Sequence, residues 1–295
     1  MNNNFILEWE IDSAGAGSLI KDFLKSQCIS KTALTDIKFR GGNILINNEM
    51  VNVRYQIKQG DHLKIVFPNE EPSLGMLGED ISLNILYEDD YLLVVNKPAG
   101  MCTIPSREHP NGSLANALIG YYQKICLSAT THIVTRLDRD TSGLVLVAKH
   151  RHVHHLFCMM QKSGKIKRTY EAFATGIIDS DSGMIEQPIA RSKESIIERV
   201  IHPDGQYACT LYKVLNRNQA FTHLELQLKT GRTHQIRVHL AFLGHPLLGD
   251  DLYGGTLSLI SRQALHCCKI VFPHPFLEKE CRFTTTLPKD MVALL

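Results

Sequence analysis

Asp138 stands where a charged segment of the chain gives way to an apolar run. Gly143 lies a short distance further along the chain, and the apolar and β-branched residues 144–148 come directly after it. Because this run does not alternate with polar residues, it predicts a strand that is buried on both faces. A carboxylate at the mouth of such a strand is held rigidly at the edge of a core, where folds place catalytic groups. The same pattern is compatible with a salt-bridged turn that enters a core strand.

Two further segments join predicted strands to polar groups. The first, 165–173, carries Tyr170, and the second, 228–240, carries Arg237. Over residues 132–171 there are eight lysines and arginines against three aspartates and glutamates, a local basic field that the net charge of +2 conceals. An aspartate, a tyrosine and several arginines in such a field suit an anionic polymer as substrate, with the aspartate available as an acid, a base or a nucleophile.

The composition is that of a soluble globular protein. The chain has 295 residues, of which 44% are hydrophobic and 21% charged, so it is long enough for two domains. Its eight cysteines include no Cys-x-x-Cys pair, which favours reduced thiols over a zinc site or a disulfide framework. No apolar stretch approaches the ~18 residues of a membrane span. We therefore expect a cytoplasmic protein with no membrane partner.

Residues 1–67 are predicted to form a small domain. The spacing of apolar residues predicts two helices and then three strands, the first two joined by an Asn-Asn turn: 19–24, 30–39, 44–46, 51–55 and 63–67. The helices carry five lysines and arginines against two aspartates, an excess that suits phosphate groups, although a solvated helix face gives the same pattern. The polar segment 68–79, which contains proline and glycine, is predicted to be a linker.

Residues 80–295 alternate predicted strands and helices and show no internal repeat. The expected elements are a hairpin at 85–95, helices at 115–122 and 150–160, and strands at 166–173, 211–215, 222–228 and 267–272.

The predicted helix that starts at His150 contains potential metal ligands. His150 and His154, and likewise His154 and Cys158, are four residues apart and share a helix face. The same helix also carries His152 and His155. No carboxylate lies among these residues, so a helix beside the basic segment is the preferred interpretation. His234 and His239 are five residues apart on a predicted strand, which would place them on opposite faces and exclude a shared metal.

Several segments resemble, in order, the motifs of the RluA-type pseudouridine synthases. They are Asn-Lys-Pro-Ala-Gly at 96–100, Thr-Arg-Leu-Asp-Arg-Asp-Thr-Ser-Gly-Leu at 135–144, Arg-Thr-Tyr-Glu-Ala at 168–172, the arginine-bearing strand at 230–240, and 264–266 with 272–275. Residues 1–67 resemble a degenerate S4-type RNA-binding module. The resemblance implies an α+β fold, in which residues 80–295 form a catalytic domain with a mixed, largely antiparallel sheet and residues 1–67 form a small α/β S4-like domain.

The resemblance also implies an activity, which is the isomerisation of uridine to pseudouridine in ribosomal or transfer RNA without a cofactor or a metal. Asp138 would be the essential carboxylate, acting by attack on the ribose C1′ or through a glycal route. Arg237 would be its partner, because an arginine favours the charged form of a carboxylate. Tyr170 would stack on the uracil and could remove the C5 proton.

Four further residues are expected to bind the substrate: Arg136, Leu265, Arg232 and Thr141. Leu265 would pack on the other face of the base, and Arg232 would contact phosphate. Arg136 would fill the gap that a flipped uridine leaves, since the target base must leave its stack to be reached.

Thr135 departs from the family pattern, which usually has histidine there, and we expect changed RNA contacts without loss of activity. Arg168 stands where lysine is common and keeps the charge. We further expect a monomer with no obligate protein partner. Two alternatives stay open: a non-catalytic RNA-binding protein with the same fold, and a metal-dependent hydrolase built on the histidine-rich helix.

Overall fold

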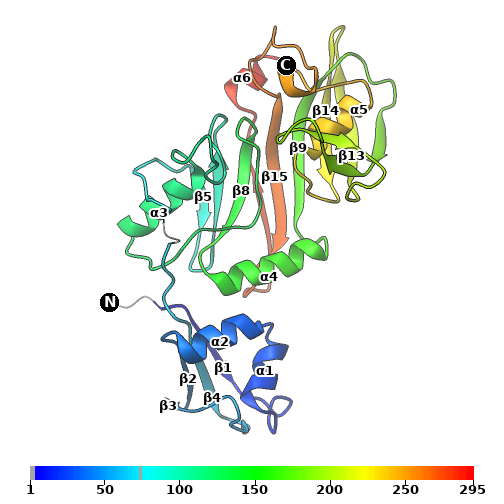
Figure 1. The fold of residues 1–295 in the computed structure, drawn as a ribbon. Coiled ribbons are helices and arrows are strands. Elements are labelled where there is room, and N and C mark those ends of the chain that lie inside the picture. The colour runs from blue at the N-terminus through cyan, green and yellow to red at the C-terminus, as the bar shows by residue number, and fades with distance from the viewer. Residues whose placement is uncertain (1–3, 73–74) are drawn as a thin grey trace.

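The computed structural model describes residues 4–72 and 75–295, which form a small lobe and a larger lobe (Figure 1). The described residues contain a four-stranded sheet, a ten-stranded sheet and a two-stranded ribbon. None of the described helices is both long enough and apolar enough to cross a membrane.

The small lobe has its own sheet and its own apolar core. Its elements are β1 (Ile6–Glu10), α1 (Ile20–Ser26), α2 (Lys31–Phe39), β2 (Asn43–Ile46), β3 (Glu49–Met50) and β4 (His62–Val66), and the strand order is β1-β4-β2-β3. The two predicted helices are confirmed, and Ser30 caps α2 by accepting a hydrogen bond from the backbone N–H of Ala33. Asn47 and Asn48 both have positive φ, as the predicted hairpin turn requires.

The strand predicted at 51–55 is wrong, because β3 ends at Met50. The carbonyl groups of Val53 and Tyr55 instead accept hydrogen bonds from the backbone N–H groups of Lys21 and Ile20 at the start of α1. This segment therefore satisfies the free donors of a helix N-terminus and does not extend the sheet.

The large lobe is built on the ten-stranded sheet. Its elements are β5 (Ile85–Glu88), β6 (Leu92–Lys97), α3 (Leu114–Lys124), β7 (His132–Ile133), β8 (Ser142–Ala148), α4 (Arg151–Lys162), β9 (Lys167–Thr175), β10 (Ser182–Glu186), β11 (Ile189–Arg191), β12 (Arg199–Ile201), β13 (Cys209–Arg217), β14 (Phe221–Leu228), α5 (Gln235–Phe242), η1 (Asp251–Tyr253), β15 (Leu265–Pro273), β16 (Glu280–Thr284) and α6 (Lys289–Val292). The main strand order is β10-β13-β14-β9-β15-β8-β6-β5, with β16 beside β15 and β7 beside β8. The pairing of β15 with β8 is parallel and the other pairs are antiparallel, so the predicted mixed, largely antiparallel α+β fold is confirmed.

β8 lies inside this sheet, and all seven of its residues are buried, as the sequence predicted. Its first residues pair with β15, Ser142 opposite His266 and Gly143 opposite Cys267. Gly143 has a φ of +115°, and a Cβ atom there would lie 2.3 Å from the carbonyl oxygen of Cys267. Only glycine therefore allows the two strands to approach at this point.

Residues 230–240 do not form the predicted strand, because α5 begins after His234. The sequence predicted a buried strand here, but the segment is a helix in which every residue from Gln235 to Leu240 is buried. Ile236 and Leu240 both pack into the main core, while Val238 packs into a separate cluster with Ile189. A helix places residues four apart on the same side, which lets this segment fill two cores at once.

Aromatic and histidine rings join the small lobe to the start of α4. Phe5 stacks on His150 with ring centroids 4.3 Å apart, and Phe67 stacks on His152 at 5.5 Å. His152 is only 3% exposed, and its Nδ1 has no hydrogen-bond partner among the described residues. Burial lowers the pKa of both histidines to about 4.

Polar contacts support the same junction. Arg151 Nη1 lies 2.8 Å from the Asp36 carboxylate of α2, and the backbone N–H of Arg151 donates to Glu70 at 2.8 Å. Glu70 also binds His132 at 2.5 Å. Glu70, near the start of the predicted linker 68–79, thus attaches the linker to the large lobe. Residues 73 and 74 of the linker lie outside the described part of the chain.

Acid is expected to weaken this junction. The folded-state pKa of His152 lies below the ordinary histidine value, so the unfolded chain binds more protons between about pH 6.5 and pH 4. The contribution of His152 to the free energy of unfolding is therefore fully present above this pH window. It decreases as the pH drops through the window, by on the order of 2 kcal/mol near pH 5. Thermal unfolding at neutral and acidic pH measures the loss, and His152→Phe should reduce it while keeping an aromatic ring. His202→Phe at an exposed turn is the control, and an equal acid loss in all three proteins would contradict the prediction.

Candidate active site

The loop that leads into β8 fixes the main chain around Asp138. The Thr103 hydroxyl donates to the carbonyl oxygen of Leu137 at 2.6 Å and accepts the Leu137 N–H at 3.2 Å. On the other side, the N–H of Thr141 donates to the carbonyl oxygen of Asp138 at 3.2 Å. The carboxylate is therefore carried by a backbone that is bonded both before and after it.

Lys97 at the end of β6 ties this loop to a neighbouring turn. Its side chain is buried, and Nζ donates to the carbonyl oxygens of Pro98, Met101 and Arg139 at 2.9, 2.7 and 3.0 Å. Burial lowers the pKa of Lys97 to about 8, although the carboxylate of Asp138 acts in the opposite direction. Because Arg139 directly follows Asp138, this ammonium group helps to hold the carboxylate in place.

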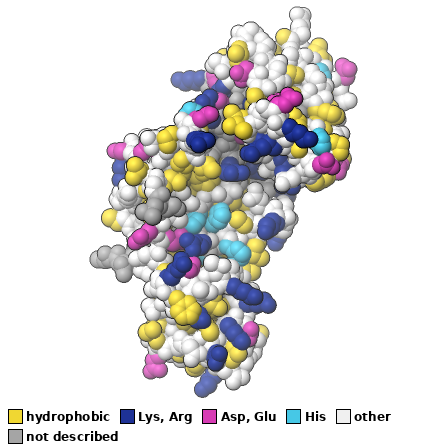
Figure 2. All heavy atoms as spheres, viewed as in Figure 1, with side chains coloured by type: hydrophobic (Ala, Val, Ile, Leu, Met, Phe, Trp, Pro, Cys, Tyr) yellow, Lys and Arg dark blue, Asp and Glu magenta, His cyan; other side chains and the backbone are white. Residues whose placement is uncertain are grey.

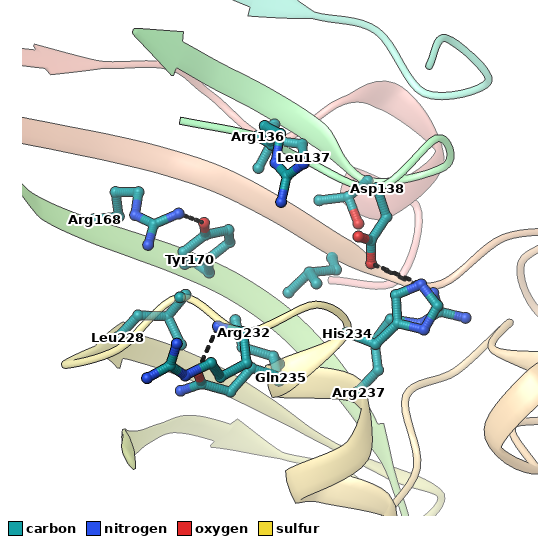
Figure 3. Close-up of a pocket in the computed structure, with 14 residues that line it drawn as sticks. Arg136, Leu137, Asp138, Arg168, Tyr170, Leu228, Arg232, His234, Gln235 and Arg237 are labelled. Carbon is teal, nitrogen blue, oxygen red and sulfur yellow. Dashed lines mark hydrogen bonds and ion pairs between the residues drawn. The ribbon is translucent and has the colours of Figure 1, made fainter. Parts of the chain in front are cut away.

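The carboxylate of Asp138 faces two side chains from the N-terminal end of α5. Arg237 Nη1 lies 3.3 Å from Oδ2, and His234 Nε2 lies 3.9 Å from the same oxygen (Figure 3). The Asp138 side chain is 28% exposed, so a substrate can still reach it. The structure thus brings Asp138 and Arg237 together, as the resemblance implied.

A second carboxylate, Asp250, fixes Arg237. Arg237 Nε and Nη2 donate to its two oxygens at 2.7 and 2.8 Å, and the Asp250 side chain is fully buried. Burial alone would lower the pKa of Arg237, but Asp250 and Asp138 outweigh burial and raise it, so the guanidinium stays charged. Sequence reasoning assigned Asp250 no role, and the only signal for one was an acidic residue soon after the apolar pair Leu247-Leu248.

His234 begins α5 in a left-handed conformation, with a φ of +55°. Its Nδ1 lies 2.9 Å from the hydroxyl of Tyr253, and that hydroxyl accepts the backbone N–H of Arg199 at 2.9 Å. Burial lowers the pKa of His234 and raises that of Tyr253 to about 12, which favours a neutral ring beside a protonated phenol. When Tyr253 donates to Nδ1, the ring proton lies on Nε2, which faces Asp138. No catalytic role for His234 was predicted from the sequence.

Tyr170 and Leu265 lie on the neighbouring strands β9 and β15, and they are 3% and 4% exposed. Arg168 Nη1 donates to the Tyr170 hydroxyl at 3.3 Å. Burial raises the pKa of Tyr170 by more than the charge of Arg168 lowers it. The phenol is therefore protonated at neutral pH.

All seven residues predicted for the site line one cavity that is open to solvent. They are Arg136, Asp138, Thr141, Tyr170, Arg232, Arg237 and Leu265. Figure 3 shows Arg168 and Tyr170 at one end of the cavity and Asp138 with His234 at the other.

The three remaining residues predicted to bind substrate differ in the exposure and the hydrogen bonds of their side chains. Arg136 is exposed and forms no ion pair with another described residue. Arg232 is also exposed, and its Nε donates to the carbonyl oxygen of Tyr207 at 3.0 Å. The hydroxyl of Thr141 is buried and accepts from Gln263 at 3.2 Å, so it supports the loop, and its contact with substrate stays a prediction.

Thr135 is 1% exposed, and its hydroxyl accepts the backbone N–H of Leu146 in β8 at 2.9 Å. This hydroxyl ties the loop to the buried strand. The expectation that threonine at this position changes the RNA contacts stays a prediction.

The histidine-rich helix α4 does not assemble a metal site. In the described ranges, 4–72 and 75–295, no group of three or more histidine, cysteine, aspartate or glutamate side chains is placed to hold a metal ion. His150 and His152 pack on the small lobe, and His239 in α5 is bonded to Thr210 and Gln187, away from His234.

Comparisons with known proteins agree with this geometry. The sequence profile of the RNA pseudouridylate synthases matches residues 91–242. The uncharacterized RNA pseudouridine synthase YjbO of Bacillus subtilis is 50% identical over 276 residues, which cover 94% of this chain and 98% of that protein. The ribosomal large subunit pseudouridine synthase D of Haemophilus influenzae is 37% identical, covering 85% of this chain and 82% of that protein. The structure of human RNA pseudouridylate synthase domain containing 1 superposes with a TM-score of 0.59 at 25% identity, covering 71% of this chain and 85% of that one. The chain therefore belongs to the RNA pseudouridylate synthase family.

Proposed function

We propose that the cavity between Asp138 and Tyr170 converts uridine in RNA to pseudouridine, with Asp138 as the essential carboxylate. The observation that carries the proposal is the buried, charged Arg237 held 3.3 Å from a carboxylate that is open to the cavity. In this reaction the bond between C1′ and N1 breaks, the uracil turns, and C5 bonds to C1′. The proton lost from C5 is balanced by one gained at N1.

Asp138 can act by either of two routes. In direct attack, a carboxylate oxygen bonds to C1′, the uracil leaves with the electron pair of the C1′–N1 bond, and C5 later displaces the carboxylate. In the glycal route, the carboxylate removes a proton from C2′ as the same bond breaks, and it returns the proton to C2′ when C5 bonds to C1′. Both routes require an ionised and oriented carboxylate. Arg237 stabilises the charge of Asp138, and the ring of His234 offers a second hydrogen-bond donor that faces the same oxygen.

Tyr170 supplies the surface on which the uracil stacks, with Leu265 on the other side. Because its phenol is protonated at neutral pH, Tyr170 can take the C5 proton only after losing its own. The guanidinium of Arg168, 3.3 Å from the phenol oxygen, would stabilise the phenolate that this step needs.

The protein is proposed to act as a cytoplasmic monomer without a cofactor or an obligate protein partner. All eight cysteines are free, which suits a reducing compartment. Ribosomal and transfer RNA both contain uridines, and the name of the Haemophilus influenzae relative favours large-subunit ribosomal RNA as the substrate.

The small lobe, residues 1–67, is proposed to be an S4-like domain that binds RNA through α1 and α2. Lys21, Lys25, Lys31 and Lys38 are exposed on these helices and form no ion pair with other described residues. Figure 2 shows lysine and arginine side chains in the hollow of the large lobe and again over the small lobe. An RNA that enters the hollow could therefore also contact the small lobe.

Asp138→Asn is expected to abolish turnover while RNA affinity is retained. The amide keeps the shape of the side chain but has no charge with which to attack C1′ or accept a proton, so the rate should fall by about 10³-fold or more. Chemical labelling of pseudouridine in unmodified total RNA under single-turnover conditions measures the loss. Asp140→Asn, two residues away and paired with Arg139, is the matched control. RNA binding without product in the wild type would favour the non-catalytic alternative.

Asp250→Asn is expected to lower the turnover number by about 10- to 100-fold, because Arg237 would lose the partner that orients it beside Asp138. Breaking a buried ion pair also costs about 3–5 kcal/mol of stability. Single-turnover rates and RNA dissociation constants should be measured below the unfolding temperature of the variant. Asp181→Asn breaks the exposed pair with Arg217 and serves as the control. A weakened RNA affinity with an unchanged rate would contradict the positioning role.

Replacing Lys21, Lys25 and Lys38 by glutamine should weaken RNA binding and reduce its dependence on salt. Each lost phosphate contact lowers the slope of log affinity against log salt by about 1. Titrations of unmodified total RNA at several salt concentrations measure the slope, with Lys58→Gln in a loop of the same lobe as control. An unchanged slope would show that the two helices do not contact RNA.

A further inference from the structure

Three cations from neighbouring strands share the sheet face opposite Tyr170. The register places Lys167 of β9 opposite Val271 of β15, and Val271 opposite Arg282 of β16. Cross-strand partners point to the same face, and Lys269, two residues before Val271, points the same way. Tyr170 is three residues beyond Lys167 on β9 and therefore points to the other face.

These cations line a groove that carries a strong local excess of positive charge. Its charged residues are Lys167, Arg168, Lys229, Lys269, Arg282 and Glu280. The single carboxylate, Glu280, lies 3.3 Å from Arg282, and both side chains are well exposed. The three lysines form no ion pair with another described residue, so their charge is available to an anion.

The groove adjoins the cavity that lies between Asp138 and Tyr170. Arg168, Leu228 and Gly231 line both spaces. A Cβ atom on Gly231 would lie 2.7 Å from Arg168 Nη2, so the guanidinium lies directly against the glycine. Figure 3 shows Arg168 beside the Tyr170 hydroxyl, at the end of the cavity away from Asp138. An RNA strand whose uridine occupies the cavity would thus pass close to the groove.

We propose that this groove binds backbone phosphates of the nucleotides that flank the target uridine. The proposal rests on the proposed function, because the groove gains this meaning only if a uridine of RNA enters the adjoining cavity. Lysine and arginine side chains on three strands suit phosphates, which repeat along a strand whatever its sequence. The groove therefore contributes affinity and orientation, while the cavity selects the base.

The test compares two variants that each lose three positive charges. In the groove variant, Lys167, Lys269 and Arg282 become glutamine. In the control variant, Lys193, Lys213 and Lys289 become glutamine, because these lysines are exposed on the large lobe and line none of the spaces described above. Thermal unfolding checks that both variants fold, and Lys167→Arg with Lys269→Arg retains the charges if the glutamine variant is unstable.

Fluorescent oligouridylates of increasing length are the probe, and their dissociation constants are measured over a series of salt concentrations. For the longer oligomers, the groove variant should lose about 2 from the salt slope, since each single-stranded phosphate contributes about 0.7. Its affinity for the shortest oligomer should match that of the wild type. The control variant should behave like the wild type with every oligomer.

An unchanged salt slope in the groove variant, or an equal loss in the control, would overturn the proposal. Turnover separates this failure from failure of the proposed function. With saturating unmodified RNA, the groove variant should form pseudouridine at the wild-type rate, because no residue facing the C1′ atom has changed. If the wild type forms no pseudouridine, the proposed function fails whatever the slopes show.

Discussion

One buried guanidinium group determines the geometry of the site. Arg237 is 6% exposed, and a charge removed from water in this way needs close partners of opposite sign. The fully buried carboxylate of Asp250 accepts two hydrogen bonds from Arg237 Nε and Nη2, which leaves Nη1 for Asp138. The two carboxylates differ in what they can do, because Asp250 is sealed inside the fold and Asp138 is open to the cavity. A single arginine thus has one buried partner that fixes it and a second, open partner, Asp138, which is the carboxylate proposed to react.

The close approach of β8 to β15 fixes the position of the Asp138 loop relative to the rest of the cavity. Asp138 precedes β8 by a few residues, and Leu265 is the first residue of β15. The two strands meet at Gly143, where a side chain would collide with the main chain of Cys267, and Ser142 Oγ lies 2.8 Å from Nδ1 of His266. The junction of β8 and β15 therefore positions both the loop that carries Asp138 and Leu265, the residue expected to pack on the base, before any substrate binds.

The sequence predicted those parts of the fold that depend on local pattern. The unbroken apolar run of β8 and the paired asparagines at the β2–β3 turn each indicate their structure without help from distant residues. α5 was mistaken for a buried strand, because its apolar residues serve two different cores and only the tertiary structure reveals this. The site residues were found through the family resemblance, since spacing alone does not show that residue 237 lies beside residue 138. Asp250 and His234 were missed for the same reason, because their roles arise from contacts made in the folded chain.

Arg168 would connect the proposed recognition of the base with the proposed recognition of the RNA backbone. Its Nη1 donates to the Tyr170 hydroxyl inside the cavity, and its Nη2 lies against Gly231 at the wall shared with the basic groove. Lysine, which is common at this position in the family, carries a compact charge on a flexible stem. The guanidinium is planar and has five donors in a fixed fork, so one edge can hold the phenol while another faces a phosphate. The glycine at 231 allows the fork to lie flat against the main chain, and the same charge that favours a Tyr170 phenolate would then be held in place by the RNA strand itself.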